Sequence, residues 1–84
     1  MDRIQAMTVF AEVAKLGSFV SAAEQLSMSA PAVTRAIAML ETQLNTRLFH
    51  RTTRRIRLTE AGQQYLSDVK RILADIAQSE AAIA

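Results

Sequence analysis

Residues 18–44 read SFVSAAEQLSMSAPAVTRAIAMLETQL, and this stretch decides the fold. It contains two apolar patterns with helical spacing, the second at about 30–45, with only a few residues between them. Ser18 and Ser29 stand directly before these patterns, where a side-chain oxygen caps a helix, and Pro31 lies in the first turn of the second. Two helices joined by so short a turn are typical of the helix-turn-helix motif.

The second helix of this pair is expected to have one buried and one open face. The apolar face consists of Val33, Ile37, Leu40 and Leu44. The opposite face consists of Pro31, Arg35, Ala38 and Thr42, with Ala32 and Met39 beside them. Its single long donor among small side chains suits a helix that enters the major groove of DNA, because little bulk lets the backbone approach the base edges. Taken alone, the same residues are equally compatible with an alanine-rich helix selected for propensity.

The segments on either side of the motif complete a small domain. Residues 2–16 are expected to form a helix that Asp2 caps and Gly17 ends. Short strand-like runs at 48–51 and 56–58 predict a two-stranded ribbon, or wing, whose register the sequence leaves open. The predicted fold class is therefore mainly α: a winged helix-turn-helix of three helices plus a two-stranded wing.

A long final helix is expected after the wing. Thr59 is its predicted N-cap, Glu60 lies in its first turn, and Gly62 is its one expected weak point. At ~1.5 Å per residue its twenty-odd residues span roughly 30 Å or more, which is longer than so small a domain needs. We therefore divide the chain into a winged helix-turn-helix domain at 1–58 and a linker, or dimerisation, helix at 59–84.

Positive charge is concentrated in one short segment. Residues 47–59 contain five arginines and no acid, a balance of +5, whereas residues 1–46 carry three basic against four acidic residues and residues 60–84 carry two against four. Arginine concentrated in this way favours a phosphate-bearing partner, because a solvated charged hairpin normally intersperses both signs. Arg54 and Arg55, at the expected tip of the wing, are placed to enter a minor groove or to hold its phosphates.

Composition excludes several other functions. The chain has no cysteine, a single histidine (His50) and only two glycines, so we predict no catalytic residue, no metal site, no glycine-rich phosphate loop and no cofactor. No apolar stretch approaches the length of a membrane span, and no signal peptide is apparent, so no membrane partner is predicted and the cytoplasm is the expected compartment.

Many residues also match a known pattern at fixed spacing. The most specific block is SAPAVTR at 29–35, and the other matching positions are Phe10, Val13, Ala14, Gly17, Ser18, Phe19, Ala22, Ala23, Leu26, Ile37, Leu40, Glu41, Leu44, Leu48, Phe49, Arg51 and LTEAG at 58–62. With these residues the chain resembles, from end to end, the N-terminal DNA-binding domain of LysR-type transcriptional regulators. So many matches at fixed spacing are far more specific than a lone motif.

The resemblance implies a function for the whole chain. It implies sequence-specific binding of double-stranded promoter or operator DNA by a dimer that reads an interrupted inverted repeat, with the recognition helix at about 30–45 in the major groove and the wing at 51–57 against the minor groove and phosphates. It also implies a tetramer in the full-length protein and a small-molecule effector bound by a C-terminal domain absent from this chain. The predicted DNA-contacting residues are Ser29, Ala30, Pro31, Ala32, Thr34, Arg35, Arg51, Thr52, Thr53, Arg54 and Arg55.

Two positions depart from the family pattern. Position 30 is usually glutamine in this family and position 20 is often threonine, but this chain has Ala30 and Val20, which offer no polar group to a base or a phosphate. Sequence specificity is therefore expected to depend more on Arg35 and the wing.

The final helix carries an apolar stripe that predicts a second copy of the chain as a partner. The predicted dimerisation residues are Leu66, Val69, Leu73, Ile76 and Ile83. A helix this long is not expected to bury its whole stripe against so small a body, and exposed stripes usually mark an interface. We expect the proximal residues to cover the winged-helix core and those from Leu73 onward to pair with a second copy.

Two alternatives remain open on these residues. A winged helix can serve as a protein-interaction module without touching nucleic acid, because fold does not determine function. Among DNA-binding families, the winged domain of a molybdate-responsive regulator is similar.

Overall fold

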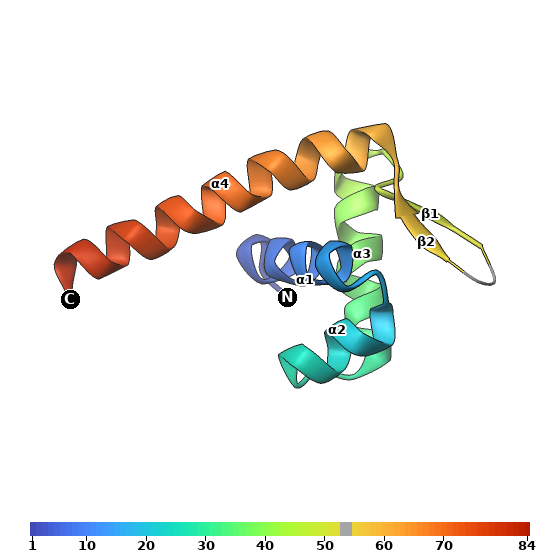
Figure 1. Cartoon of the computed structure of the whole chain (residues 1–84), viewed down its shortest axis with the longest axis horizontal. Coiled ribbons are helices and arrows are strands. Elements are labelled where there is room, and N and C mark those ends of the chain that lie inside the picture. The colour runs from blue at the N-terminus through green and yellow to red at the C-terminus, as the bar shows by residue number, and fades with distance from the viewer. Residues whose placement is uncertain (53–54) are drawn as a thin grey trace.

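The structure, a computed structural model, describes residues 1–52 and 55–84. These residues form four helices and a two-stranded antiparallel sheet (Figure 1). Their order along the chain is α1 (Arg3–Leu16), α2 (Phe19–Leu26), α3 (Ala30–Leu44), β1 (Phe49–Arg51), β2 (Ile56–Leu58) and α4 (Glu60–Ile83). This arrangement confirms the predicted winged helix-turn-helix with a long final helix.

Local hydrogen bonds fix where the helices begin and end. The side chains of Asp2, Ser18, Ser29 and Thr59 each accept a hydrogen bond from the backbone N–H three residues on, at 2.6, 3.1, 3.2 and 2.9 Å between donor and acceptor. Gly17, Ser27 and Asn45 end α1, α2 and α3 in the left-handed conformation, with φ of 67°, 55° and 50°. The caps predicted at Asp2, Gly17, Ser18, Ser29 and Thr59 are thus confirmed. Together with Ser27 and Asn45 they determine the lengths of the elements.

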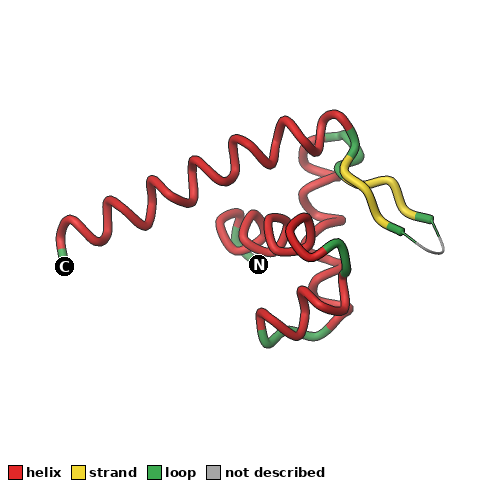
Figure 2. The backbone as a smooth tube through the Cα atoms, viewed as in Figure 1, coloured by secondary structure: helices red, strands yellow, loops and turns green. Residues whose placement is uncertain are grey.

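α1 is the central helix of the body. It packs against α2, α3 and α4, and Figure 2 shows it lying between α4 on one side and α2 on the other. The ring of Phe10 is fully buried, with its centroid 5.4 Å from that of Phe49 and 5.3 Å from that of Tyr65. Three segments far apart in the sequence therefore meet at one aromatic cluster, which joins the helices to the wing and to α4.

The buried face of α3 is shorter than its period suggested. Val33, Ile37 and Leu40 are fully buried as expected, but Leu44 is 37% exposed. Ile4, in the first turn of α1, is likewise 43% exposed. An apolar pattern with helical spacing can continue to the last turn of a helix, but a side chain is buried only where another element packs against that turn. The apolar pattern therefore predicts too many core residues in the terminal turns.

The wing is a short antiparallel pair whose register only the structure reveals. Phe49 pairs with Leu58 and His50 pairs with Arg57, so the first pair faces the core while the second faces outward. The last pair brings Arg51 opposite Ile56.

The joint between the wing and α4 is tightly packed. Leu48 is buried, and its carbonyl oxygen accepts a hydrogen bond of 3.0 Å from the Thr59 N–H. Gly62 is buried in the first turn of α4, and a Cβ added to it would clash with that same carbonyl oxygen and lie 3.0 Å from Cδ2 of Leu58. Gly62, expected as the weak point of the helix, therefore also has a packing role: the missing Cβ lets α4 approach the wing this closely.

α4 changes character along its length. It lies against the body at its start and protrudes well beyond it at its C-terminal end (Figure 1). Val69 is fully buried in the common core, while Leu66 and Leu73 are half-buried and packed against it. Because this chain already covers the side chain of Val69, as expected for the proximal part of the helix, we leave Val69 out of the interface proposed below. Leu73 also packs against the core, although we expected residues from Leu73 onward to pair with a second copy. The contact between α4 and the body thus extends one turn farther than the sequence suggested.

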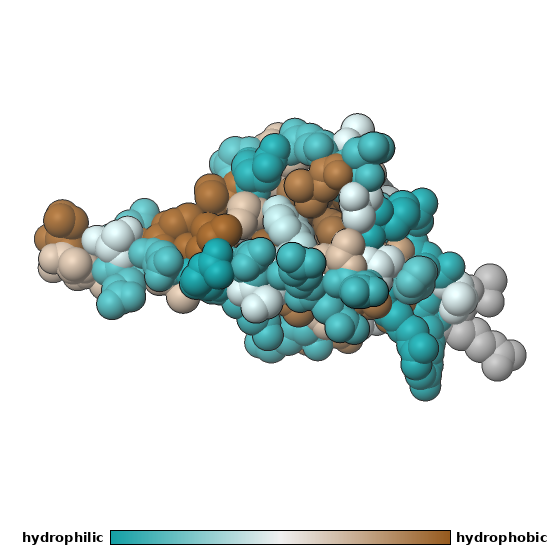
Figure 3. All heavy atoms as spheres, turned by 90° about the horizontal axis from the view of Figure 1, so that it is seen from above, coloured by the Kyte–Doolittle hydropathy of each residue, from teal (hydrophilic) through white to brown (hydrophobic). Residues whose placement is uncertain are grey.

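The last two turns of α4 are uncovered. Every residue from 77 to 84 is exposed, including Ile83 at 88%, and Ile76 is only half-buried. Seen from above, the protruding part of α4 shows hydrophobic patches between polar side chains (Figure 3). Within the described residues, no helix is both long and apolar enough to cross a membrane.

Candidate nucleic-acid interface

The outer face of α3 is open to solvent. Pro31, Arg35, Ala38 and Thr42 are all exposed, as the projection of the helix predicted. Arg35 lines a hollow of about 370 Å³ together with Met1, Ala32, Ala36 and Met39. No acidic side chain forms an ion pair with Arg35 among the residues that the structure describes. Its guanidinium is therefore available to an outside acceptor, on a face with little bulk.

A second feature, the wing groove, lies where α2, α3 and the wing meet. It has a volume of about 460 Å³ and is lined by Gly17, Ser18, Phe19, Val20, Thr34, Arg51, Thr52, Arg55 and Ile56. Two arginines and several hydroxyl groups thus border one groove at the side of the recognition helix. Such a groove is suited to a phosphate backbone, which is bound by arginine and by Ser and Thr hydroxyls.

Four residues predicted separately from the sequence meet in the wing groove. They are Thr34 from α3 and Arg51, Thr52 and Arg55 from the wing. The backbone N–H of Thr52 donates to the Arg55 carbonyl oxygen at 2.8 Å, which closes the described part of the wing. Val20 also lines the groove and is 59% exposed, so an apolar side chain stands where the family often has a threonine.

The other predicted contact residues are distributed along the start of α3. Ser29 uses its hydroxyl oxygen as the N-cap, and the Thr34 hydroxyl donates to the Ala30 carbonyl oxygen at 3.1 Å. Ala30 is exposed. The predicted contacts Thr53 and Arg54 lie outside the described residues.

Arg51 is held in place from two sides. Its guanidinium carbon lies 4.9 Å from the centroid of the Phe19 ring, a cation–π contact, and its Nη2 donates to Oε1 of Glu41 at 3.4 Å. Two such contacts restrain a side chain that would otherwise have many rotamers. The arginine therefore stands in a defined position at the border of the wing groove.

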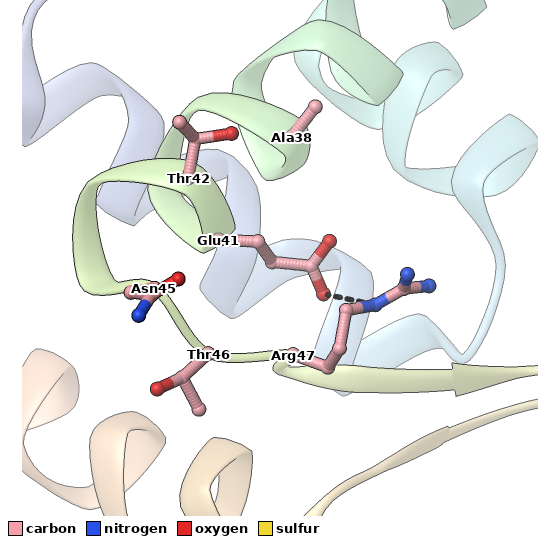
Figure 4. Close-up of a pocket in the computed structure, with 6 residues that line it drawn as sticks. All are labelled: Ala38, Glu41, Thr42, Asn45, Thr46 and Arg47. Atoms are coloured by element: carbon pink, nitrogen blue, oxygen red, sulfur yellow. Dashed lines mark ion pairs between the residues drawn. The ribbon is translucent and has the colours of Figure 1, made fainter.

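Glu41 is the site residue that sequence reasoning missed. Its Oε2 accepts hydrogen bonds from the backbone N–H groups of Leu48 at 2.8 Å and Phe49 at 3.3 Å, and lies 3.6 Å from Nε of Arg47. Figure 4 shows the carboxylate of Glu41 projecting from α3 toward Arg47 across the turn between helix and wing. The carboxylate therefore connects α3 to the base of the wing.

A local signal for Glu41 did exist. It lies four residues after Ile37, at the edge of the buried face of α3, where a charged side chain needs a partner. Counted by segment, Glu41 belongs to the first part of the chain and Arg47 and Arg51 to the arginine-rich part. Arg47 and Arg51 come close to Glu41 only because the chain folds back toward α3 after the helix ends.

Comparison with known proteins places this geometry in a family. The family model described as bacterial regulatory helix-turn-helix protein, lysR family, matches residues 4–63. The chain is 47% identical over 74 residues to the HTH-type transcriptional regulator CrgA of Neisseria meningitidis serogroup B, covering 88% of this chain and 25% of that protein. It is 42% identical over 76 residues to the HTH-type transcriptional activator AaeR of Escherichia coli K12, covering 90% of this chain and 25% of that protein.

Solved structures agree with this assignment. The CbnR DNA-binding domain in complex with DNA superposes with a TM-score of 0.91 at 35% identity, covering 98% of this chain and 93% of that one. The BenM DNA-binding domain in complex with catB site 1 DNA superposes with a TM-score of 0.93 at 25% identity, covering 99% and 92%.

The match covers most of this chain but a minor part of its relatives. The chain spans about 25% of the length of the CrgA and AaeR proteins. The sequence left two DNA-binding families open, the LysR-type regulators and the molybdate-responsive regulators. The family model favours the LysR-type regulators. The chain belongs to the lysR family of bacterial regulatory helix-turn-helix proteins and carries that family's DNA-binding winged helix-turn-helix domain.

Proposed function

We propose that this domain binds double-stranded operator DNA with α3 in the major groove and the wing against the adjacent backbone, and that two copies joined through α4 read an inverted repeat. One observation carries the proposal. The open face of α3, where Arg35 has no ion pair among the described residues, lies beside a groove that Thr34 of α3 lines together with Arg51 and Arg55, so a donor for base edges and cations for phosphates lie close together. The CbnR and BenM domains that superpose on this chain are in complex with DNA.

The roles divide by residue type. Arg35 is long enough to bond a guanine edge through two donors, while Pro31 and Ala32 are small apolar groups suited to a thymine methyl. Thr34, Thr52 and the wing arginines suit phosphate oxygens, and we extend this role to Thr53 and Arg54 from the sequence alone. Ser29 and Ala30, at the start of α3, allow the backbone to approach the groove.

The second copy is supported by the uncovered end of α4. Ile76 and Ile83 lie on the same side of the helix and have no cover from this chain comparable to that of Val69. Pairing two such helices would bury both stripes. It would also relate two recognition helices by a two-fold axis, so that each reads one half-site of a palindromic operator. The interface we now propose comprises Ile76 and Ile83, with the exposed parts of Leu66 and Leu73 at its margin.

The experiment that tests the DNA-binding face replaces Arg35. A duplex is first selected from a random pool with the wild-type domain, and affinities are measured on this duplex and on a scrambled one. Arg35→Ala is expected to cost about 1–3 kcal/mol on the selected duplex and to relax the preference at one base pair per half-site.

The matched control is Lys70→Ala. It removes one positive charge from an exposed position on α4, which belongs neither to α3 nor to the wing, and should change both affinities little. Equal losses on the selected and scrambled duplexes for Arg35→Ala would reduce Arg35 to a phosphate contact. A wild-type domain that binds no duplex would refute the proposed function itself.

A further inference from the structure

Two grooves flank the point where α3 ends and the wing begins. The first is the wing groove, which Arg51 borders. The second, the helix-end groove, has a volume of about 440 Å³ and is lined by Ala38, Glu41, Thr42, Asn45, Thr46 and Arg47 (Figure 4). Ala38 and Thr42 belong to the open face of α3, so the helix-end groove adjoins the proposed DNA-binding face. Each groove therefore contains one arginine that Glu41 contacts.

Glu41 is the fixed member of this set. Its side chain is only 10% exposed, compared with 34% for Arg51 and 68% for Arg47. The two backbone N–H groups that it accepts come from Leu48 and Phe49, which are both buried. Because these donors belong to the packed backbone, the carboxylate cannot follow either arginine. The arginines are instead held by the carboxylate.

This arrangement changes the electrostatics that the sequence suggested. In the part of the chain that the structure describes, Glu41 forms ion pairs within 4.0 Å with two arginines of residues 47–59, Arg47 and Arg51. Among the described residues, Arg55 and Arg57 have no acidic partner within that distance. The base of the wing is therefore partly neutralised from within, while these two arginines keep their full charge.

We propose that Glu41 is a positioning residue for DNA recognition, which holds Arg51 at the wing groove and keeps Arg47 from binding the phosphates of any duplex indiscriminately. The inference rests on the proposed function. Arg51 has five N–H donors, so it can bond Glu41 with one nitrogen and still offer others to a phosphate. Arg47, mostly exposed beside the helix-end groove, would add a sequence-independent phosphate contact if it were released. Specificity is a difference between affinities, and an acid that weakens non-specific binding increases that difference.

The test is the isosteric change Glu41→Gln in the whole chain, measured on the selected duplex and on a random-sequence duplex over a range of salt concentrations. Releasing one phosphate-binding arginine should steepen the dependence of log K on log salt for the random duplex by about one unit. The ratio of selected to random affinity should fall by about tenfold, because Arg51 loses its orientation while non-specific binding gains.

Glu24→Gln is the matched control. It removes the same charge from an exposed position on α2 that has no ion pair among the described residues. Its salt dependence should stay within about half a unit of the wild type. If Glu41→Gln behaves like Glu24→Gln, or loses affinity for both duplexes equally with an unchanged salt slope, the proposal is overturned and Glu41 only stabilises the fold. Absence of any wild-type binding would instead refute the proposed function, so the two failures are distinguishable.

A second variant keeps the proposal testable if Glu41→Gln does not fold. Arg47→Gln leaves the carboxylate and both of its backbone hydrogen bonds in place and alters only a mostly exposed side chain. Because Arg47 is proposed to be held off the DNA, its loss should leave the salt slope on the selected duplex unchanged. A slope that becomes shallower by about one unit would show that Arg47 already binds a phosphate, which contradicts the proposal.

Discussion

The body of the domain and the distal end of α4 use apolar residues in opposite ways. In the body, Phe10, Phe49 and Ile37 are each no more than 2% exposed, so the apolar pattern is fully used within one chain. Beyond Val69 the same kind of pattern continues along α4, but cover decreases until Ile83 is 88% exposed. A periodic apolar stripe therefore has two meanings. Near the body it describes the core, and far from the body it describes a surface that only another molecule can cover.

The largest expected effect comes from the aromatic cluster of the body. Phe10→Ala removes a fully buried ring that contacts Phe49 and Tyr65, so it should lower the free energy of unfolding by about 3–5 kcal/mol. Ile83→Ala, at the distal end, should change it by less than about 0.5 kcal/mol in the monomer. Urea unfolding at low protein concentration measures both. Similar losses for the two variants would remove the distinction between the regions.

The next effect concerns the proposed partner of the distal helix. Ile76→Glu with Ile83→Glu places two charges on the uncovered stripe, so the domain should stay folded but monomeric and lose duplex affinity on the order of 10²-fold. Sedimentation across concentrations gives the oligomeric state.

The control for this pair uses the opposite side of α4. Ala74→Glu with Gln78→Glu adds the same charge at exposed positions and should leave the association unchanged. A wild-type domain that remains monomeric at every concentration, with and without duplex, would contradict the proposed dimer.

A smaller effect on stability is expected from exchanging glycine and alanine at two positions of α4. Gly62→Ala adds a Cβ against the Leu48 carbonyl oxygen and should destabilise the fold by about 1–3 kcal/mol, although alanine is the better helix former. Ala74→Gly, at an exposed position farther along, should cost only the ordinary ~1 kcal/mol. Thermal unfolding of both variants decides this, and a stabilising Gly62→Ala would show that the joint is not close-packed.

The smallest effect is a pH dependence of stability that comes from Tyr65, which lies in the part of α4 that packs against the body. Burial raises the pKa of the Tyr65 phenol above its ordinary value of 10.0, while the positive charge of Arg3 lowers it by less. The folded state thus holds this proton more tightly than the unfolded chain does. Its contribution to stability is present below about pH 10 and is lost as pH rises through the raised pKa.

Tyr65 is suited to direct measurement. It is the only tyrosine in a chain without tryptophan, so the ultraviolet absorbance of phenolate reports on it alone. The midpoint of the titration should be higher in the native protein than in the same protein unfolded by urea. Equal midpoints would place Tyr65 in water rather than against the core.

Local chemistry made most of the elements predictable. A cap, a left-handed stop or a proline acts on backbone groups within about four residues, so Ser29 and Asn45 are sufficient to bound α3 without knowledge of the rest of the fold. In the same way, the arginines of the wing and the open face around Arg35 were visible in the sequence, because they depend on composition and on helical spacing alone.

Only the tertiary structure decided which residues become partners. Glu41 meets Arg47 and Arg51 because the chain turns back on α3, and Val69 is buried in the common core because α4 packs against the body. The period of a helix identifies a face, but it carries no information about how far a neighbouring element extends along it. The sequence by itself therefore determined a winged helix-turn-helix with an arginine-rich wing. Long-range packing decided which of these arginines lie against Glu41 and how far along α4 the core extends.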